Sequence, residues 1–204
     1  MEKAKILKVR VTMMEDTLGT ASANPEIHKE FISSKAPDAP SMEEEVEALG
    51  TEEVFEKGMT VFHRDKDGTP IVWDYQWKGF FKDACGILRK VPKSECGKIK
   101  AYKKEIDGLI FPEPRKIPIH FDGDMEICQR PLRAQTAQGE RVALASSESI
   151  PAGATMEFEI KMLFAGHEKA VREMLDYGKY RGFGQWRNSG KGRFTYEVLE
   201  EREE

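Results

Sequence analysis

The sequence predicts an α+β protein with a ferredoxin-like (RRM-like) core, in which strands and helices follow in the order β-α-β-β-α-β. Two observations indicate this fold: segments that alternate apolar and polar residues occur near both ends of the 204-residue chain, and two amphipathic helical segments lie between extended ones. We expect one domain over 1–204, with its core at about 4–13, 58–91 and 124–199 and insertions at about 14–57 and 92–123.

The first strand is predicted at residues 4–13, where Leu7, Val9 and Val11 alternate with basic and polar residues. The proline-containing segment 15–41 that follows is long for a loop and irregular. A capping box that begins at Ser41 then predicts a short helix.

A hairpin and the first core helix come next. The Asp67-Gly68 turn separates two extended segments, Met59–Arg64 and Pro70–Trp73. From Asp74 to Lys90, apolar residues recur three and four positions apart, which predicts an amphipathic helix. The basic, proline-punctuated stretch after this helix is interpreted as an insertion with short strands.

The second half of the chain predicts four strands and one helix. Two extended segments, near 125–135 and 140–146, flank a polar turn, and Thr155–Leu163 alternates clearly between apolar and charged residues. A helix is predicted at His167–Tyr177, and the last strand begins at Phe194.

Composition excludes several classes of protein. Lys and Arg number 32 against 36 Asp and Glu, and no apolar stretch approaches the roughly 20 residues of a membrane span. The three cysteines form no CxxC pair and the four histidines form no HExxH motif, so we expect neither a disulfide framework nor a zinc site. We therefore expect a cytoplasmic protein with reduced thiols, without a cofactor or a metal.

The segment 178–194 is the most informative part of the chain. It holds five glycines, four aromatic residues and five cations, with no acidic residue. Glycines let a backbone approach a bulky anion, cations neutralise phosphates, and aromatic rings stack on unpaired bases, so single-stranded nucleic acid fits this composition. The alternative is a surface turn whose aromatic residues fill the core. In its simplest form the nucleic-acid hypothesis expects an exposed loop whose guanidinium groups are not paired with neighbouring carboxylates; if they are paired, an RNA site here has to use the N–H donors and the charge that the ion pairs leave over.

Three segments together resemble the RAMP superfamily, the repeat-associated RNA-binding proteins of CRISPR systems. The hairpin and helix GTPIVWDYQWKGFF (68–81) is similar to the family's strand, Lys-Gly and first helix, and ESIPAGATMEF (148–158) is similar to its Pro-x-Gly element. The stretch 182–194 resembles its glycine-rich loop. Tyr75-Gln76-Trp77 departs from the family's small serines before Lys-Gly.

The resemblance implies an RRM-like core that grips RNA with the start of the first helix and the glycine-rich loop, as in the backbone subunits that line a guide RNA. It implies an antiviral-defence role in a ribonucleoprotein, with guide-like single-stranded RNA and other subunits, including copies of this chain, as partners. The expected RNA-binding residues are Gln76, Lys78, Lys179, Arg181, Gly182, Phe183, Gly184, Trp186, Arg187, Gly190, Lys191, Gly192 and Arg193.

Three alternatives remain open. A metal-independent endoribonuclease that processes guide precursors would use His28 or His63 as a base. Separately, Asp16 could serve a metal-assisted cut, as an acidic residue does in some backbone subunits, or it is an acid that favours the turn after the strand. A fold-mimicking inhibitor, phage-borne or not, would use the acidic run at 43–56, which is otherwise a solvated helix face. A single-stranded DNA binder would lack any contact with the 2′-hydroxyl.

Overall fold

The computed structural model describes residues 3–22, 58–136 and 139–204, and these residues fall into two compact units. The first, here called the sheet unit, comprises Met1–Thr17, His63–Asp124 and Ile150–Glu204. The second, the hairpin unit, comprises Leu18–Phe62 and Met125–Ser149. Each unit is described by itself, and the extent of a single domain over 1–204 stays a prediction.

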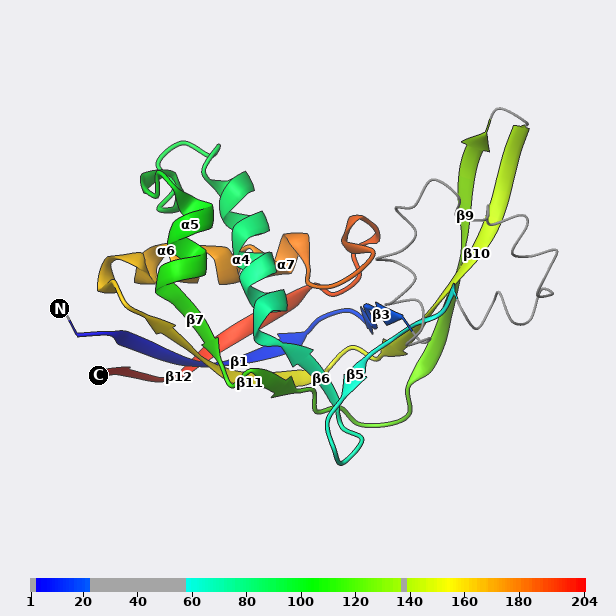
Figure 1. The fold of residues 1–204 in the computed structure, drawn as a ribbon, viewed down its shortest axis with the longest axis horizontal. Helices are drawn as coiled ribbons and strands as arrows, with labels where there is room; N and C mark the ends of the chain where they lie inside the picture. The colour runs from blue at the N-terminus through cyan, green and yellow to red at the C-terminus, as the bar shows by residue number, and fades with distance from the viewer. Residues whose placement is uncertain (1–2, 23–57, 137–138) are drawn as a thin grey trace, which may run out of the picture. The chain divides into compact units, whose positions relative to one another are not determined.

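The sheet unit is built on a four-stranded antiparallel sheet with the strand order β12-β1-β11-β7. The strands are β1 (Lys5–Met13), β7 (Ile110–Glu113), β11 (Thr155–Met162) and β12 (Phe194–Glu203). The helices α4 (Asp74–Leu88), α5 (Tyr102–Leu109), α6 (Glu168–Asp176) and the short α7 (Gly178–Arg181) lie on one side of this sheet (Figure 1). Short 3-10 turns occur at η1 (Cys96–Lys98), η2 (Ala165–His167) and η3 (Arg187–Ser189). The predicted α+β fold class is confirmed, and the four-stranded sheet with its helices is compatible with a ferredoxin-like core.

The second strand of this core lies in a place that the sequence analysis did not predict. Strand β7 and helix α5 both fall within 92–123, the range that we interpreted as an insertion. Ile110 is fully buried and pairs with Met162 of β11, so β7 is an edge strand of the core sheet. A strand of four residues is too short to show the alternation that predicts a strand. The residues that pair with it lie about fifty positions later in the chain, so the local sequence does not indicate the pairing.

Trp77 of α4 occupies the centre of the core and has no exposed surface. Its ring lies 4.6 Å from that of Phe158 on β11 and 5.4 Å from that of Phe194 on β12, measured between centroids. Phe80 and Phe81 of the same helix complete the aromatic cluster. The spacing of these residues on one helix face is the pattern that predicted α4.

A smaller sheet of three strands flanks the start of α4 in the sheet unit. It consists of β5 (His63–Arg64), β6 (Pro70–Trp73) and β8 (Lys116–Pro118), in that order. The carboxylate of Asp65 accepts hydrogen bonds from the backbone N–H groups of Asp67 and Thr69, at 2.9 and 2.8 Å, and this fixes the turn between β5 and β6. The predicted hairpin is therefore confirmed.

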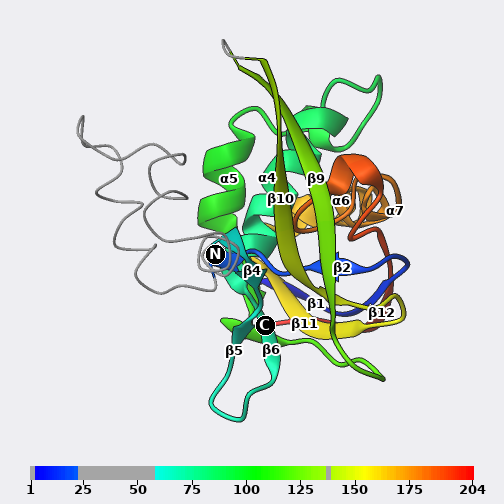
Figure 2. The same cartoon turned by 90° about the vertical axis from the view of Figure 1, so that its right-hand side faces the viewer.

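The hairpin unit contains the longest strands found among residues 3–22, 58–136 and 139–204. Strands β9 (Glu126–Thr136) and β10 (Gly139–Ile150) pair antiparallel along their whole length and form an extended ribbon (Figure 2). The short strands β2 (Thr17–Leu18), β3 (Ala21–Ser22) and β4 (Thr60–Val61) join the same sheet. These two long strands confirm the extended segments predicted near 125–135 and 140–146, although we had placed them in the core. The helix predicted from Ser41, the acidic run 43–56 and His28 lie outside the described residues.

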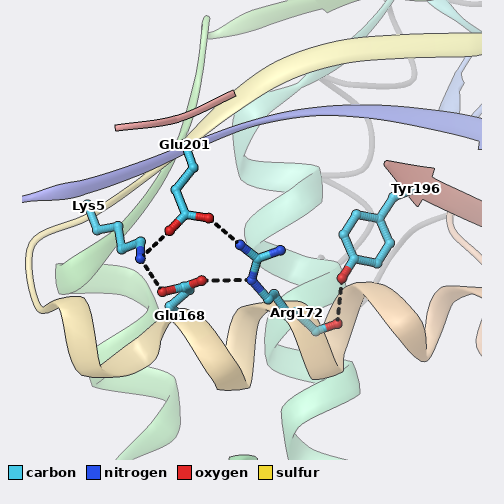
Figure 3. Close-up of polar contacts among 5 residues, drawn as sticks. All are labelled: Lys5, Glu168, Arg172, Tyr196 and Glu201. Atoms are coloured by element: carbon cyan, nitrogen blue, oxygen red, sulfur yellow. Dashed lines mark hydrogen bonds and ion pairs between the residues drawn. The ribbon is translucent and has the colours of Figure 1, made fainter. Parts of the chain in front are cut away.

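A closed set of ion pairs ties both ends of the chain to α6 (Figure 3). The Lys5 ammonium lies 2.5 Å from carboxylate oxygens of both Glu168 and Glu201, and Arg172 donates to the same two carboxylates at 2.8 and 2.7 Å. Partial burial acts to raise the pKa of Glu168, but its bonds with Lys5 and Arg172 outweigh this, so the pKa lies below its ordinary value of 4.5. The network therefore favours the ionised carboxylate in the folded state.

We expect the ionised Glu168 to contribute to stability at neutral pH. Its pKa is lower in the folded state than in the unfolded chain, so the contribution is present above about pH 4.5 and is lost as the pH falls through the folded value. The Glu168→Gln variant should show a smaller drop in urea midpoint between pH 7 and pH 3 than the wild type. Glu203→Gln on β12 is the control, and an equal drop in all three proteins would contradict the stabilising role.

Candidate nucleic-acid interface

The glycine-rich loop runs from α7 through η3 to the start of β12. Its backbone adopts positive φ at Gly182, Gly184, Gly190 and Gly192, and also at Trp186 (φ 57°). A positive φ is rare for a bulky residue such as tryptophan, so the surrounding loop must hold Trp186 in place. The loop therefore has a defined conformation.

Backbone hydrogen bonds fasten the two arms of the loop to each other and to the segment after β1. The N–H of Phe183 donates to the carbonyl of Gly192, and the N–H of Gly192 donates to the carbonyl of Asp16, both at 2.8 Å. A Cβ at Gly192 would lie 1.9 Å from the Phe183 carbonyl oxygen, so only glycine fits there. The arms therefore approach as closely as the backbone allows.

Phe183 does not offer a stacking surface. Its side chain is 4% exposed, and its ring stacks on Trp77 at 4.6 Å between centroids with an interplanar angle of 27°. The prediction that Phe183 could stack on a base is wrong, because the ring fills the core. Tyr180, by contrast, is 69% exposed, and Trp186 lies at the surface in part.

Four of the five loop cations form ion pairs with carboxylates. Arg181 and Arg187 both donate to Asp83 of α4, at 2.9 and 2.7 Å. Lys191 lies 2.5 Å from Asp16, and Arg193 lies 2.7 Å from Glu15. The expectation of a cationic strip without carboxylate partners is therefore wrong. The acids come from α4 and from the segment after β1, so the composition of the loop could not reveal them.

The ion pairs do not cancel the positive charge of the loop. Five cations face three carboxylates, and Asp83 serves two arginines at once. Partial burial acts to raise the pKa of Asp83, but the bonds and charges of Arg181 and Arg187 outweigh it and the pKa is lowered. Lys179 is exposed, with its ammonium 5.1 Å from the Tyr180 ring centroid. A local excess of positive charge remains.

An open pocket of about 280 Å³ lies on this loop. Its lining residues are Arg181, Gly184, Trp186, Arg187 and Asn188. The Arg181 guanidinium donates to Asn188 Oδ1 at 3.0 Å as well as to Asp83, and each guanidinium has five N–H donors. Among the residues that the structure describes, the Arg187 guanidinium has hydrogen bonds to Asp83 alone. Both arginines thus keep donors for an anion while Asp83 holds their orientation.

The two expected binding residues at the start of α4 have structural contacts. Gln76 Oε1 accepts the N–H of Trp73 at 2.8 Å, which caps the helix N-terminus. The Lys78 ammonium donates to the carbonyl of Asp107 at 3.0 Å and lies 4.2 Å from the Phe111 ring centroid. Both side chains therefore fasten α4 to its neighbours.

The sheet face opposite the helices carries ion pairs. Arg10 bonds to both Glu157 and Glu197, at 2.7 and 2.9 Å, and Arg202 pairs with Glu159 at 2.7 Å. The basic residues that alternate with Leu7, Val9 and Val11 in the first strand include Arg10, and carboxylates of the neighbouring strands compensate its charge. This face therefore lacks the charge excess that the loop retains.

The residues considered for catalysis are engaged in contacts of other kinds. Asp16 accepts the N–H of Ala152 at 3.3 Å and pairs with Lys191, while the His63 ring packs edge-on against Trp73. Within residues 3–22, 58–136 and 139–204, no group of three His, Cys, Asp or Glu side chains is placed to hold a metal ion.

No helix of these residues is both long and apolar enough to cross a bilayer.

The comparisons with known proteins concern the fold. No family model matches the chain, and no curated protein matches its sequence. Among solved structures it resembles a chain in the cryo-EM structure of the Type III-B Cmr-beta bound to cognate target RNA, with a TM-score of 0.55 and 13% identity. The alignment covers 98% of this chain and 61% of that one. At this identity the likeness concerns the fold alone, and membership of the RAMP superfamily stays a prediction.

The close approach of the two arms of the loop predicts how much alanine at two of its glycines lowers the free energy of unfolding. Gly190→Ala should cost about 1–2 kcal/mol from its positive φ, because a Cβ there meets no atom closer than 3.6 Å. Gly192→Ala adds a backbone clash to the same strain and should cost at least about 3 kcal/mol. Urea unfolding measures both, and equal losses would show that the two arms do not approach as described.

Proposed function

We propose that this protein binds single-stranded RNA and acts as a subunit of a CRISPR-type ribonucleoprotein. The observation that carries the proposal is the pocket in which Arg181 and Arg187, oriented by one carboxylate, lie beside Trp186. The resemblance of the fold to a chain of the RNA-bound Cmr-beta supports it. The RNA would be guide-like, and the partners would be other subunits of the assembly, including copies of this chain.

The pocket offers the three kinds of contact that an unpaired nucleotide requires. The free donors of Arg181 and Arg187 would bind a phosphate, and guanidinium groups suit phosphate oxygens because two N–H groups can donate in parallel. Trp186 would stack on a base, and the amide of Asn188 could reach a base edge or a 2′-hydroxyl. Gly184 allows the strand to pass close to the backbone.

The ion pairs with Asp83 would affect RNA binding at the pocket in two ways. A carboxylate shared by two guanidinium groups keeps both side chains in place before RNA arrives, so less side-chain entropy is lost on binding. It also lowers the charge that a phosphate meets, and the remaining excess at the loop supplies the attraction. The proposed contacts of Lys179, Gly182, Gly190, Lys191, Gly192 and Arg193 are with the RNA backbone along the same loop.

The other functions considered have weaker support. For the endoribonuclease, the His63 ring packs edge-on against Trp73. For the inhibitor, the acidic run lies outside the described residues. RNA binding is therefore the function that the geometry favours.

We expect Arg181→Gln combined with Arg187→Gln to weaken binding to an unstructured 20-nucleotide RNA about 10-fold or more at 0.1 M salt. Each lost phosphate contact should lower the slope of log K against log salt by about 0.7, so the double variant should lose about 1.4. Fluorescence anisotropy over a series of salt concentrations measures both quantities.

Two controls make this test specific. Lys103→Gln combined with Lys104→Gln removes the same charge from exposed positions on α5 and should leave the slope nearly unchanged. Adding Asp83→Asn to the arginine variant avoids an uncompensated carboxylate, so a loss of affinity cannot be assigned to misfolding. An unchanged slope in both arginine variants would reject the pocket as the RNA site.

A further inference from the structure

A second aromatic and basic cluster lies where β6 meets α4, away from the glycine-rich loop in sequence. Trp73 ends β6, and Tyr75 lies in the first turn of α4. Their rings stack, with centroids 6.2 Å apart and an interplanar angle of 15°. Tyr75 is 55% exposed, an unusual exposure for a ring of this size, so this two-ring stack faces solvent.

Two cations, one at the start of β8 and one just before it, lie beside the inner ring of this stack. Trp73 pairs with Lys116 across the β6–β8 ladder, and the Lys116 ammonium lies 5.5 Å from the Trp73 ring centroid. The Arg115 guanidinium lies 5.8 Å from the same centroid. The edge of His63 packs against Trp73 as well, with ring centroids 5.7 Å apart. The position of Trp73 is thus fixed from several sides.

These cations differ from those of the glycine-rich loop. Arg115 and Lys116 are exposed, and neither forms an ion pair with a carboxylate of the described residues. Their charge is therefore available to an anion, whereas the loop arginines share theirs with Asp83. An exposed aromatic stack beside two cations without carboxylate partners is the combination found in proteins that bind single-stranded nucleic acid.

We propose that Tyr75 stacks on an unpaired base of the bound RNA, and that Arg115 and Lys116 contact the adjacent phosphates. This inference rests on the proposed function and gives the RNA a second contact surface. The base would form the third layer of a stack whose inner layers are Tyr75 and the cation-flanked Trp73. Trp73 contributes by holding the tyrosine ring in a plane that a base can meet.

A proline-rich peptide is the other ligand that aromatic surfaces of this kind bind, but such a peptide carries no negative charge that would pair with two adjacent cations. A phosphodiester strand carries one phosphate for each base, so its phosphates would lie beside the cations when a base stacks on the ring. The charges beside the rings therefore favour RNA as the occupant.

Substitutions at Tyr75 test the stacking role in the full-length protein. With the same 20-nucleotide RNA, Tyr75→Ala should weaken binding about 5- to 100-fold, and Tyr75→Phe should bind like the wild type because it keeps the ring. Arg115→Gln combined with Lys116→Gln should lower the salt slope by about 1.4, with Lys103→Gln combined with Lys104→Gln as the charge-matched control.

The outcomes separate this inference from the proposed function. If Tyr75→Ala binds as tightly as the wild type while the Arg181 and Arg187 variant binds weakly, the stacking role is overturned and RNA binding stands. If the wild type binds no RNA, both fall. A labelled proline-rich peptide gives a further test. If the peptide binds through Tyr75 and neither RNA nor DNA displaces it, the inference is overturned.

Discussion

The packing of Trp77 is the constraint on which the rest of the sheet unit depends. Its ring contacts Phe158 on β11, Phe194 on β12 and Phe183 in the glycine-rich loop, so one buried residue joins the sheet, the first helix and the loop. The space around it is full: a Cβ at Gly178 would lie 2.2 Å from the Phe194 ring. Because cores pack this densely, the loop cannot change its path without opening the aromatic cluster. The rigidity of the candidate site is therefore a property of the core.

The same packing explains why the loop cations have carboxylate partners. Asp83 lies on α4 less than two turns after Trp77, so the contact between Trp77 and Phe183 brings Asp83 against the arginines of the loop. Asp16 is joined to the loop by the backbone bond from Gly192, and this places its carboxylate beside Lys191. The ion pairs follow from the path of the backbone. A phosphate bound there would meet side chains that are already ordered.

Local periodicity predicted the elements that carry a clear apolar pattern in their own sequence. The strands β1 and β11 and the helices α4 and α6 each show a clear apolar pattern, and each was found close to its expected bounds. Strand β7 lies where short strands were expected, but it was assigned to an insertion, because its place in the core is set by its pairing with β11 and not by its own four residues. The candidate RNA site stays a prediction, and the sequence could not reveal the carboxylate partner of its arginines, since Asp83 lies about a hundred residues before them. The cluster at Trp73 was missed for the same reason, because Arg115 and Lys116 reach it through a strand pairing.

The two proposed RNA surfaces differ in charge compensation, and this difference suits them to different stages of binding. Cations paired with carboxylates contribute little to the field at a distance, whereas Arg115 and Lys116 contribute fully and would attract a polyanion during the encounter. The two loop arginines share one carboxylate, so this pair would contribute less to that field, and its fixed orientation would favour one geometry of the phosphate. Charges without partners act mainly on the association rate, and ordered contacts act mainly on the dissociation rate. Removing Arg115 and Lys116 would therefore slow association of the RNA. Removing Arg181 and Arg187 would speed its dissociation.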